Sequence, residues 1–486
     1  MSLSNALSNA VSGIVAASRG TEVVSTNLAN ALTPGFARRE LQLSPRPYVS
    51  AGGGVHVDGV SRIVRTSVLA QNRIAAGETA RTTTLAEFHK SVSDSMGVPG
   101  ESRAMTTLVA NFDAALVTAA ARPDNETNLG RVVATASQLA QKFNTLGAEI
   151  QNARTQADRA ISADVQILND GLKRIAELNR KITVQLSAGN DATALQDARQ
   201  ATIDEIARIV PLQEVPREGG RIALFTMQGG VLLDGSKPLQ FDFQPAGPII
   251  AGMQVGTSQL RLLSVEGIEL TGGGMSMFAG GRLGANFQIR DIDAPAAQAR
   301  LDSAAHDIYS RFAASDVDLT LSTGAAGLFT DAGSPLSAAG EVGLSQRLQV
   351  NAAADPDRGG QLWRVRDGLE AAAPGAVGES ALLDRMRTAM ARQRIPDVNG
   401  MSLIARTAGM MASDITSAAA AGRLDAEGLQ SAASAQSNAF EAMMRQDGVD
   451  SDKEMETLLA LERAYASNAK VLKAVDEMIQ TILRLT

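Results

Sequence analysis

Residues 451–486 carry an apolar pattern that strongly limits what this chain can fold into. The apolar residues recur in steps of three and four, which places them on one stripe of a single helix. They are Leu458, Leu461, Tyr465, Leu472, Val475, Ile479 and Ile482, with Asn468 as the polar residue in the stripe. No proline or glycine interrupts the stretch, and charged residues occupy its other face. The stripe therefore needs a partner helix.

The start of this helix also has a sequence signal. Ser451 followed three residues later by Glu454 is typical of a capping box, and Gly448 lies just upstream. Fixing the backbone costs about 1–2 kcal/mol per residue, whereas a fully covered apolar side chain returns about 1.5–3 kcal/mol. The pattern predicts a helix that is marginal without a partner.

The N-terminal stretch repeats this pattern with smaller side chains. Its stripe consists of Leu3, Leu7, Ala10, Ile14, Ala17, Thr21, Val24, Leu28 and Ala31. Alanines allow close approach of helices but bury little area each, and Pro34 predicts the end of the helix. The ordinary interpretation of both stretches is a pair of amphipathic helices in a globular core.

Length and composition restrict the class of protein. A chain of 486 residues exceeds one ordinary core, and with only 3% aromatic residues it favours packed helices and elongated shapes. The net charge of −7 argues against nucleic acid and anionic membranes as partners. No apolar run is long enough to cross a bilayer, and we expect no cleaved secretory signal. Cysteine is absent, which excludes disulfides and thiol catalysis.

The middle of the chain predicts a helical rod that carries β-rich insertions. Residues 85–121 predict helix with a break at Gly97, residues 129–186 predict one helix of roughly 85 Å, and residues 192–209 predict a helix that folds back along it. Short strands are expected at residues 221–226, 230–233, 239–243, 260–265 and 275–278, with further ones at 346–350 and 362–365. Helix returns at residues 280–312, 379–393 and 402–445.

These elements predict a mainly α, elongated multidomain protein with an inserted β domain. The N- and C-terminal helices form a coiled coil, followed by the long helical rod and an outer β-rich domain. The expected division is a terminal assembly domain of residues 1–84 and 446–486, a helical rod of 85–215, 280–315 and 376–445, a β-rich domain of 216–279, and a small irregular or β segment of 316–375.

Residues 44–77 predict loop and brief strands, and the surrounding sequence is locally basic. The arginines are Arg38, Arg39, Arg46, Arg62, Arg65 and Arg73. In an otherwise acidic chain we interpret them as a solvated face in preference to a subunit contact.

No catalytic or metal-binding pattern is apparent. His56, His89 and His306 lie far apart with no acidic residue at metal-ligand spacing, and neither a serine-nucleophile motif nor a zinc-binding helix occurs. We expect no enzyme activity, no metal and no cofactor.

Residues 25–39, STNLANALTPGFARR, change the interpretation of the two helices. The block resembles the N-terminal signature of the flagellar axial proteins, the family of rod, hook and hook-associated proteins. The signature positions are Asn27, Asn30, Thr33, Pro34, Gly35 and Phe36. The C-terminal run from Glu454 through Tyr465 to Met478 is similar to the matching end of that family, although Arg463 and Ala466 depart from its usual pattern.

Further stretches resemble the hook-associated protein 1 family, notably residues 96–100, 125–179, 197–209, 229–235 and 280–291. The resemblance implies a non-enzymatic structural subunit of the bacterial flagellum, secreted by type III export, at the junction between hook and filament. It implies a ring of about eleven copies in one helical layer. It also implies contacts with the hook protein and with a second junction protein next to the filament, and a small cytosolic export chaperone on the C-terminal helix. Neither nucleic acid nor membrane is an implied partner.

We therefore expect the subunit to polymerise through its terminal helices, with termini that are mobile until neighbours cover them. The expected contact residues are Leu3, Leu7, Ile14, Val24, Leu28, Leu458, Leu461, Tyr465, Leu472, Val475, Ile479 and Ile482. One alternative is another type III-secreted protein, such as a needle-tip or translocator protein, which would lack the signature block. A second is an exported enzyme with axial-type ends, which would require a catalytic cluster within residues 216–363.

Overall fold

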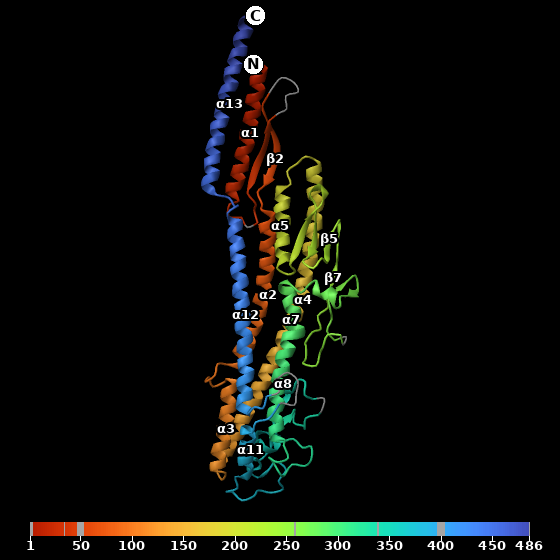
Figure 1. Ribbon diagram of the computed structural model, residues 1–486, viewed down its shortest axis with the longest axis vertical. Coiled ribbons are helices and arrows are strands. Elements are labelled where there is room, and N and C mark those ends of the chain that lie inside the picture. The colour runs from red at the N-terminus through yellow and green to blue at the C-terminus, as the bar shows by residue number, and fades with distance from the viewer. Residues whose placement is uncertain are drawn as a thin grey trace.

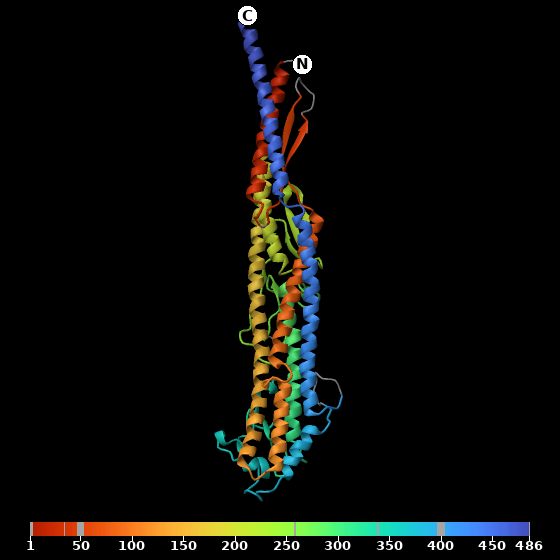
Figure 2. The ribbon, with the colours of Figure 1, turned by 90° about the vertical axis from the view of Figure 1, so that its left-hand side faces the viewer.

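The molecule is a long rod with both chain ends at the same end (Figures 1 and 2). The structure is a computed structural model that describes residues 3–33, 35–45, 53–256, 259–337, 340–395 and 404–485. Within these residues, long helices make up most of the structure, and four small sheets lie along its sides. The predicted fold class, mainly α and elongated with an inserted β region, is confirmed.

Helix α4 (Glu126–Ser187) runs through most of the rod. Its 62 residues correspond to roughly 90 Å. It begins where the Asn125 side chain accepts a hydrogen bond from the backbone N–H of Asn128 at 3.3 Å. Helix α5 (Thr193–Ala207) packs back along its upper end, as the sequence predicts.

Helices α2 (Thr66–Met96) and α12 (Ala408–Arg445) pack against each other along the rod. The prediction of loop and strands up to residue 77 is therefore wrong from Thr66 onward, and α2 crosses the expected domain boundary at residue 84. Gly77 lies inside α2 at a position where a Cβ would stand 2.8 Å from the backbone oxygen of Ala207. The glycine permits close packing of α2 on the end of α5.

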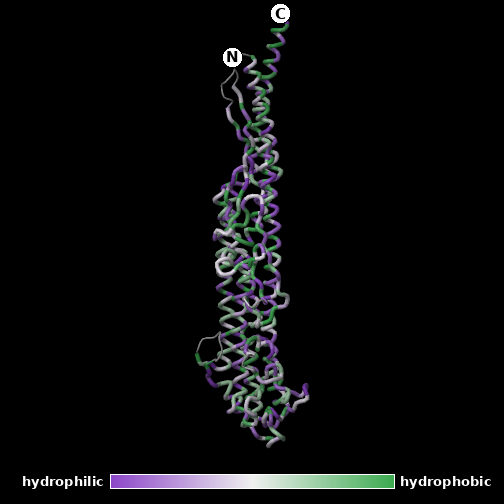
Figure 3. Tube along the Cα trace, turned by 90° about the vertical axis from the view of Figure 1, so that its right-hand side faces the viewer, coloured by the Kyte–Doolittle hydropathy of each residue, from purple (hydrophilic) through white to green (hydrophobic). Residues whose placement is uncertain are grey.

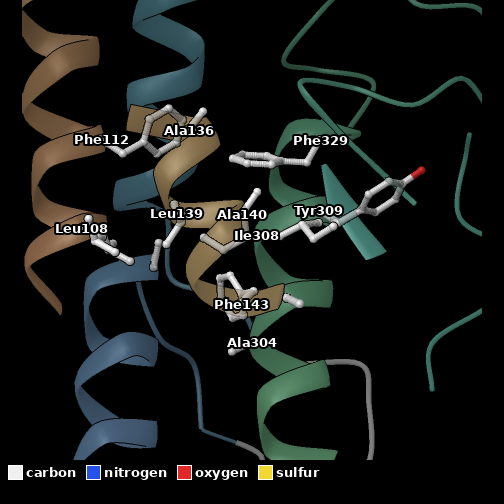
Figure 4. Close-up of a cluster of buried hydrophobic side chains, with 14 of the residues drawn as sticks. Leu108, Phe112, Ala136, Leu139, Ala140, Phe143, Ala304, Ile308, Tyr309 and Phe329 are labelled. Atoms are coloured by element: carbon white, nitrogen blue, oxygen red, sulfur yellow. The ribbon is translucent and has the colours of Figure 1, made fainter. Parts of the chain in front are cut away.

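The far end of the rod contains the larger apolar core (Figure 4). Helices α3 (Met105–Ala121), α4 and α8 (Ala294–Phe312) supply half of its buried residues, and α11 (Ala381–Ala391) adds to it. The Phe112 ring lies 5.5 Å from that of Phe312 and 5.8 Å from that of Phe329, in tilted and edge-on arrangements. This core joins segments that lie between Leu85 and Ile415 in the chain.

The inserted β region packs on the upper half of α4 and forms a second core with Leu168, Ile206 and Leu233. One antiparallel sheet contains β3 (Leu212–Pro216), β4 (Ile222–Thr226), β5 (Val231–Asp234) and β6 (Lys237–Pro238). A second contains β7 (Phe241–Asp242), β8 (Ser264–Val265) and β9 (Ile268–Glu269). Strands β10 (Phe329–Asp331) and β11 (Leu348–Val350) pair near the larger core.

Two predicted strands are helical. The segment expected as a strand at 275–278 overlaps α6 (Gly273–Ser276), and the one at 362–365 lies at the start of α10 (Trp363–Asp367). Four residues are too few to separate a period of two from one helical turn. Other short helices are the 3-10 segments Glu218–Gly220, Ala352–Ala354 and Pro356–Arg358, together with α9 (Leu344–Arg347).

Buried charged groups connect α4 to the turn between α7 (Gly281–Gln288) and α8 and to the β region. This π-helical turn, Ile289–Asp293, places Arg290 against Asp158 of α4 at 2.7 Å, and both side chains are almost completely buried. The Arg290 guanidinium stacks 5.0 Å from the Phe287 ring. Arg154 donates to the backbone oxygen of Met253 at 2.8 Å. Charge-assisted hydrogen bonds therefore connect an irregular segment to a regular helix.

The terminal unit contains α1 (Leu3–Ala29), the hairpin of β1 (Arg39–Pro45) and β2 (Val55–Arg62), and α13 (Ser451–Leu485). Helices α1 and α13 pack side by side and run antiparallel, while the hairpin covers another side of α1 (Figure 1). Hydrophobic and hydrophilic residues alternate along both helices (Figure 3). The predicted coiled coil of the two chain ends thus forms within one molecule.

Candidate functional site

The paired helices of the terminal unit have a regular register. Gly13 faces Asn468, Gly20 faces Leu461, and Asn27 hydrogen-bonds Glu454, so each pair is seven residues from the next on both helices. A Cβ on Gly13 would stand 2.6 Å from Asn468 Nδ2. One on Gly20 would stand 2.8 Å from Leu461 Cδ2.

The two glycines therefore allow the helices to approach closely at these positions. Glycines have no side chain and so do not appear in an apolar stripe. The heptad spacing of Gly13, Gly20 and Asn27 was the signal that could have found this contact.

Within one chain, α1 and α13 cover only some of each other's predicted contact residues. Val24 and Val475 are buried, at 5% and 2% exposure. Seven are half-buried: Leu3, Leu7, Ile14, Leu458, Leu461, Leu472 and Ile479. Leu28, Tyr465 and Ile482 are exposed, at 37%, 48% and 50%. The stripe on α13 therefore has an inner edge against α1 and an outer edge in solvent.

Other large apolar side chains of the terminal unit are exposed as well. On α13 they are Met455, Leu459, Val471, Met478 and Leu483; on α1 they are Val11 and Val15; Leu32 follows α1 and is 95% exposed. At the open end of the pair, a groove of about 830 Å³ is lined mainly by Leu3, Ala6, Ala474, Met478 and Ile482. An apolar surface of this extent indicates a binding surface.

The signature block forms the base of the terminal unit, and Asn27 is its best-buried member at 1% exposure. The Asn27 Nδ2 donates to the Arg39 backbone oxygen at 2.9 Å, and the Asn27 Oδ1 accepts from the Arg39 backbone N–H at 2.9 Å. Asn30 donates to the Thr26 backbone oxygen and accepts from the Thr33 hydroxyl. The first asparagine thus connects α1 to β1, and the second ends α1.

Gly35 and Phe36 complete the return of the chain toward β1. Gly35 has a φ of 80°, which favours glycine, and the Phe36 backbone N–H donates to the Thr33 oxygen at 3.2 Å. The Arg39 guanidinium lies 5.0 Å from the centre of the Phe36 ring. Pro34 lies outside the described residues. The signature residues described here are structural.

The predicted capping box at the start of α13 is wrong. Asp450 caps this helix instead, because its Oδ1 accepts from the backbone N–H groups of Asp452 and Lys453 at 3.1 and 3.3 Å. Glu454 is turned inward at 1% exposure. Its carboxylate accepts from Arg38 Nε at 2.7 Å and from Asn27 Nδ2 at 3.1 Å. A tertiary ion pair has replaced the local cap.

The interpretation of the arginines as a solvated face is also wrong, because the described ones form ion pairs within the chain. Arg39 and Arg62 contact Asp197 of α5 at 3.2 and 2.7 Å, and Arg65 contacts Asp447. Arg73 pairs with Asp204 at 2.6 Å and with Glu214. Arg46 lies outside the described residues. Sequence alone could not show these pairs because each partner is more than a hundred residues away.

Burial raises the pKa of the Asp204 carboxyl, because the effect of burial exceeds the opposing effect of the nearby Arg73 guanidinium. The three histidines lie apart, with His56 at 3.9 Å from Asp58 and His89 at 3.7 Å from Asp293.

The described part of the chain contains no group of three or more His, Cys, Asp or Glu residues that could hold a metal ion. Among its helices, none has the length and apolar character needed to span a bilayer.

Comparisons with known proteins agree with these features. Residues 90–327 match the family model of the flagellar hook-associated protein FlgK helical domain, and residues 441–485 match that of the flagellar basal body rod FlgEFG protein C-terminal. Flagellar hook-associated protein 1 of Salmonella typhimurium strain LT2 is 26% identical over 251 residues, which cover 50% of this chain and 45% of the relative. The Escherichia coli K12 protein of the same name is 24% identical over 251 residues, 50% of this chain and 46% of the relative.

The matched segment thus spans less than half the length of these relatives. A solved structure, the flagellar hook junction protein FlgK from Burkholderia pseudomallei, aligns with a TM-score of 0.44 and 19% identity over 54% of this chain and 46% of that one. The chain thus carries the helical domain of the flagellar hook-associated protein FlgK family, and its curated relatives named above are flagellar hook-associated protein 1.

Proposed function

We propose that this protein is a structural subunit of the bacterial flagellum that forms the junction between hook and filament. The observation that carries the proposal is the terminal unit, whose helices pair with each other and still expose Tyr465, Met478 and Leu32. Covering these side chains with neighbouring subunits removes apolar surface from water, which favours association.

The proposed contacts are those that the helix stripes and the family suggest. Copies of the subunit associate through the terminal helices into a ring of about eleven in one helical layer. The hook protein lies on one side and a second junction protein on the filament side. The contact residues are the outer edges of the two stripes, and the rod and β region form the outer layers.

The same apolar surface requires protection before assembly. We propose that the subunit is secreted through the flagellar type III apparatus and that a small cytosolic chaperone covers α13 beforehand. The thin terminal unit, a helix pair and one hairpin, is held to the rod by few contacts and can unfold separately from it. The subunit has no catalytic role in this proposal.

Deletion of the gene tests the junction role. We expect cells with hooks but without filaments, and flagellin monomers in the medium. Complementation with the intact gene restores filaments. Normal filaments in the deletion strain would overturn the proposal.

A further inference from the structure

The terminal unit, taken as residues 3–62 and 451–485, is joined to the rod by two short segments that lie next to each other. These are residues 63–65 and 446–450. Arg65 bridges them, because its side chain pairs with Asp447 and its Nη2 donates to the Met443 backbone oxygen at 2.6 Å. Two adjacent connections form a hinge, since a rotation at this point changes only a few backbone angles.

Apolar packing adds little to the connection between the terminal unit and the rod. The two large buried apolar clusters, which extend over most of the rod, contain no residue of the terminal unit among the described residues. A crevice of about 1450 Å³ separates the two parts on the hairpin side. Val57 and Val60 of β2 line one wall, and Gln196 and Leu212 of the rod line the other. The terminal unit therefore has room to tilt without disrupting a core.

One cluster of polar side chains spans the gap. Asp197 of α5 accepts from Arg62 Nε at 2.7 Å and from Arg39 Nη2 at 3.2 Å, and Arg62 also donates to Gln200 at 2.5 Å. Asp197 therefore accepts hydrogen bonds from both strands of the hairpin and Gln200 from β2 alone, and these bonds connect the terminal unit to α5. We call Arg39, Arg62, Asp197 and Gln200 the clasp.

We infer that Asp197 is a positioning residue that holds the terminal unit at one angle to the rod, and that release of the clasp lets the unit tilt about the hinge. The carboxylate binds two arginines from the two strands of the hairpin, so its loss removes both ion pairs at once. The three charged side chains are 14–15% exposed, so water can replace these contacts when they break. This inference concerns the subunit itself and does not depend on the proposed function.

A distance measurement in the intact chain tests the clasp. The chain has no cysteine, so two introduced cysteines can be spin-labelled selectively. Lys173→Cys on α4 and Ala466→Cys on α13 report the angle between rod and terminal unit, and both positions are exposed. Ser18→Cys with Ala466→Cys reports the terminal unit alone.

We expect a narrow distance distribution for the first pair in the parent chain and a distribution at least twice as broad after Asp197→Asn. Arg39→Gln with Arg62→Gln should broaden it equally, and the triple variant should add nothing, because all three substitutions break the same contacts. Glu205→Gln, an exposed acid on the same helix, should leave it narrow. The pair within the terminal unit should stay narrow throughout, which separates tilting from unfolding.

Two results would overturn the inference. One is an unchanged distribution in both Asp197→Asn and the double arginine variant, and the other is a parent distribution as broad as that of the variants. Circular dichroism identifies a variant that fails to fold, and in that case the remaining clasp variant decides the outcome.

Discussion

The side-chain amide of Asn27 donates a 3.1 Å hydrogen bond to the carboxylate of Glu454, 427 residues further along the chain. Both side chains are 1% exposed. Asn27 also bonds the backbone of Arg39, and Glu454 also bonds Arg38, so this contact joins the base of α1, the start of β1 and the start of α13. It gives the signature asparagine a definite structural role.

Glu454→Ala should therefore loosen the terminal unit and leave the rod intact. The substitution leaves the Asn27 amide and the Arg38 guanidinium without this acceptor, at a cost of about 1–3 kcal/mol. Amide hydrogen exchange followed by mass spectrometry should show faster exchange in α1 and α13 and no change in α4. Glu456→Ala, an exposed acid on the same helix, is the matched control. Equal exchange in both variants would contradict the role of Glu454.

Gly20→Leu should separate the two terminal helices. A Cβ alone at Gly20 would approach Leu461 Cδ2 to 2.8 Å, and the three further carbon atoms of leucine have no space unless the helices move apart. Overpacking of this kind costs about 1–3 kcal/mol. Exchange in α1 and α13 should rise, and Leu461→Ala added to Gly20→Leu should partly restore protection. Ser18→Leu, at an exposed position, should have little effect, and a similar loss there would argue against the close-approach explanation.

The long periodic helices could be predicted from sequence because many turns repeat one pattern. The 62 residues of α4 were bounded to within three residues at the N-terminal end and one at the C-terminal end. The first part of α2, from Thr66 to Gly77, could not be predicted because the short alternating pieces among glycines and prolines just before it indicate loop and strands. Gly77 allows close packing of α2 against the end of α5, and Arg73 forms an ion pair with Asp204. Neither of these long-range contacts produces a local sequence pattern.

In the terminal unit, too, the helices could be predicted from sequence but their long-range contacts could not. The stripes of α1 and α13 could be predicted from spacing, but which edge of each stripe the partner covers depends on the register between distant segments. That register depends on Gly13, Gly20 and the pairing of Asn27 with Glu454. The carboxylate of Glu454 was assigned to a local cap because Arg38 and Asn27 are distant in sequence and no pattern connects them.

Stability should depend on pH through Asp302, which is 5% exposed and accepts hydrogen bonds from Gln298 and from the backbone N–H groups of Gly343 and Ser345. Burial raises its pKa. A raised pKa means that the folded state holds its proton more tightly than the unfolded state, so the contribution is complete below the ordinary aspartate pKa of about 3.9 and is lost as pH rises through the folded value.

Asp302→Asn removes this titration. The unfolding free energy of the parent minus that of the variant should be largest near pH 4 and should fall by up to about 1.4 kcal/mol per pH unit within the window between the two pKa values. Urea titrations from pH 4 to pH 7 measure it, with Asp170→Asn on α4 as an exposed control. A difference that grows as pH rises would contradict the raised pKa.

Tyr465→Asp with Met478→Asp should prevent assembly without unfolding the subunit. Both side chains are about half exposed in the single chain, at 48% and 47%, so charge at these positions meets water in the monomer. In a ring of subunits the same carboxylates would be buried against neighbours, which is costly without a partner charge. We expect unchanged circular dichroism and thermal unfolding of the purified variant, but loss of swimming and of filaments in cells that carry it. Lys470→Asp with Lys473→Asp also adds negative charge to α13, on its polar face, and should preserve motility. Normal motility of the Tyr465 and Met478 variant at wild-type protein level would show that the outer edge of the α13 stripe is not the assembly contact.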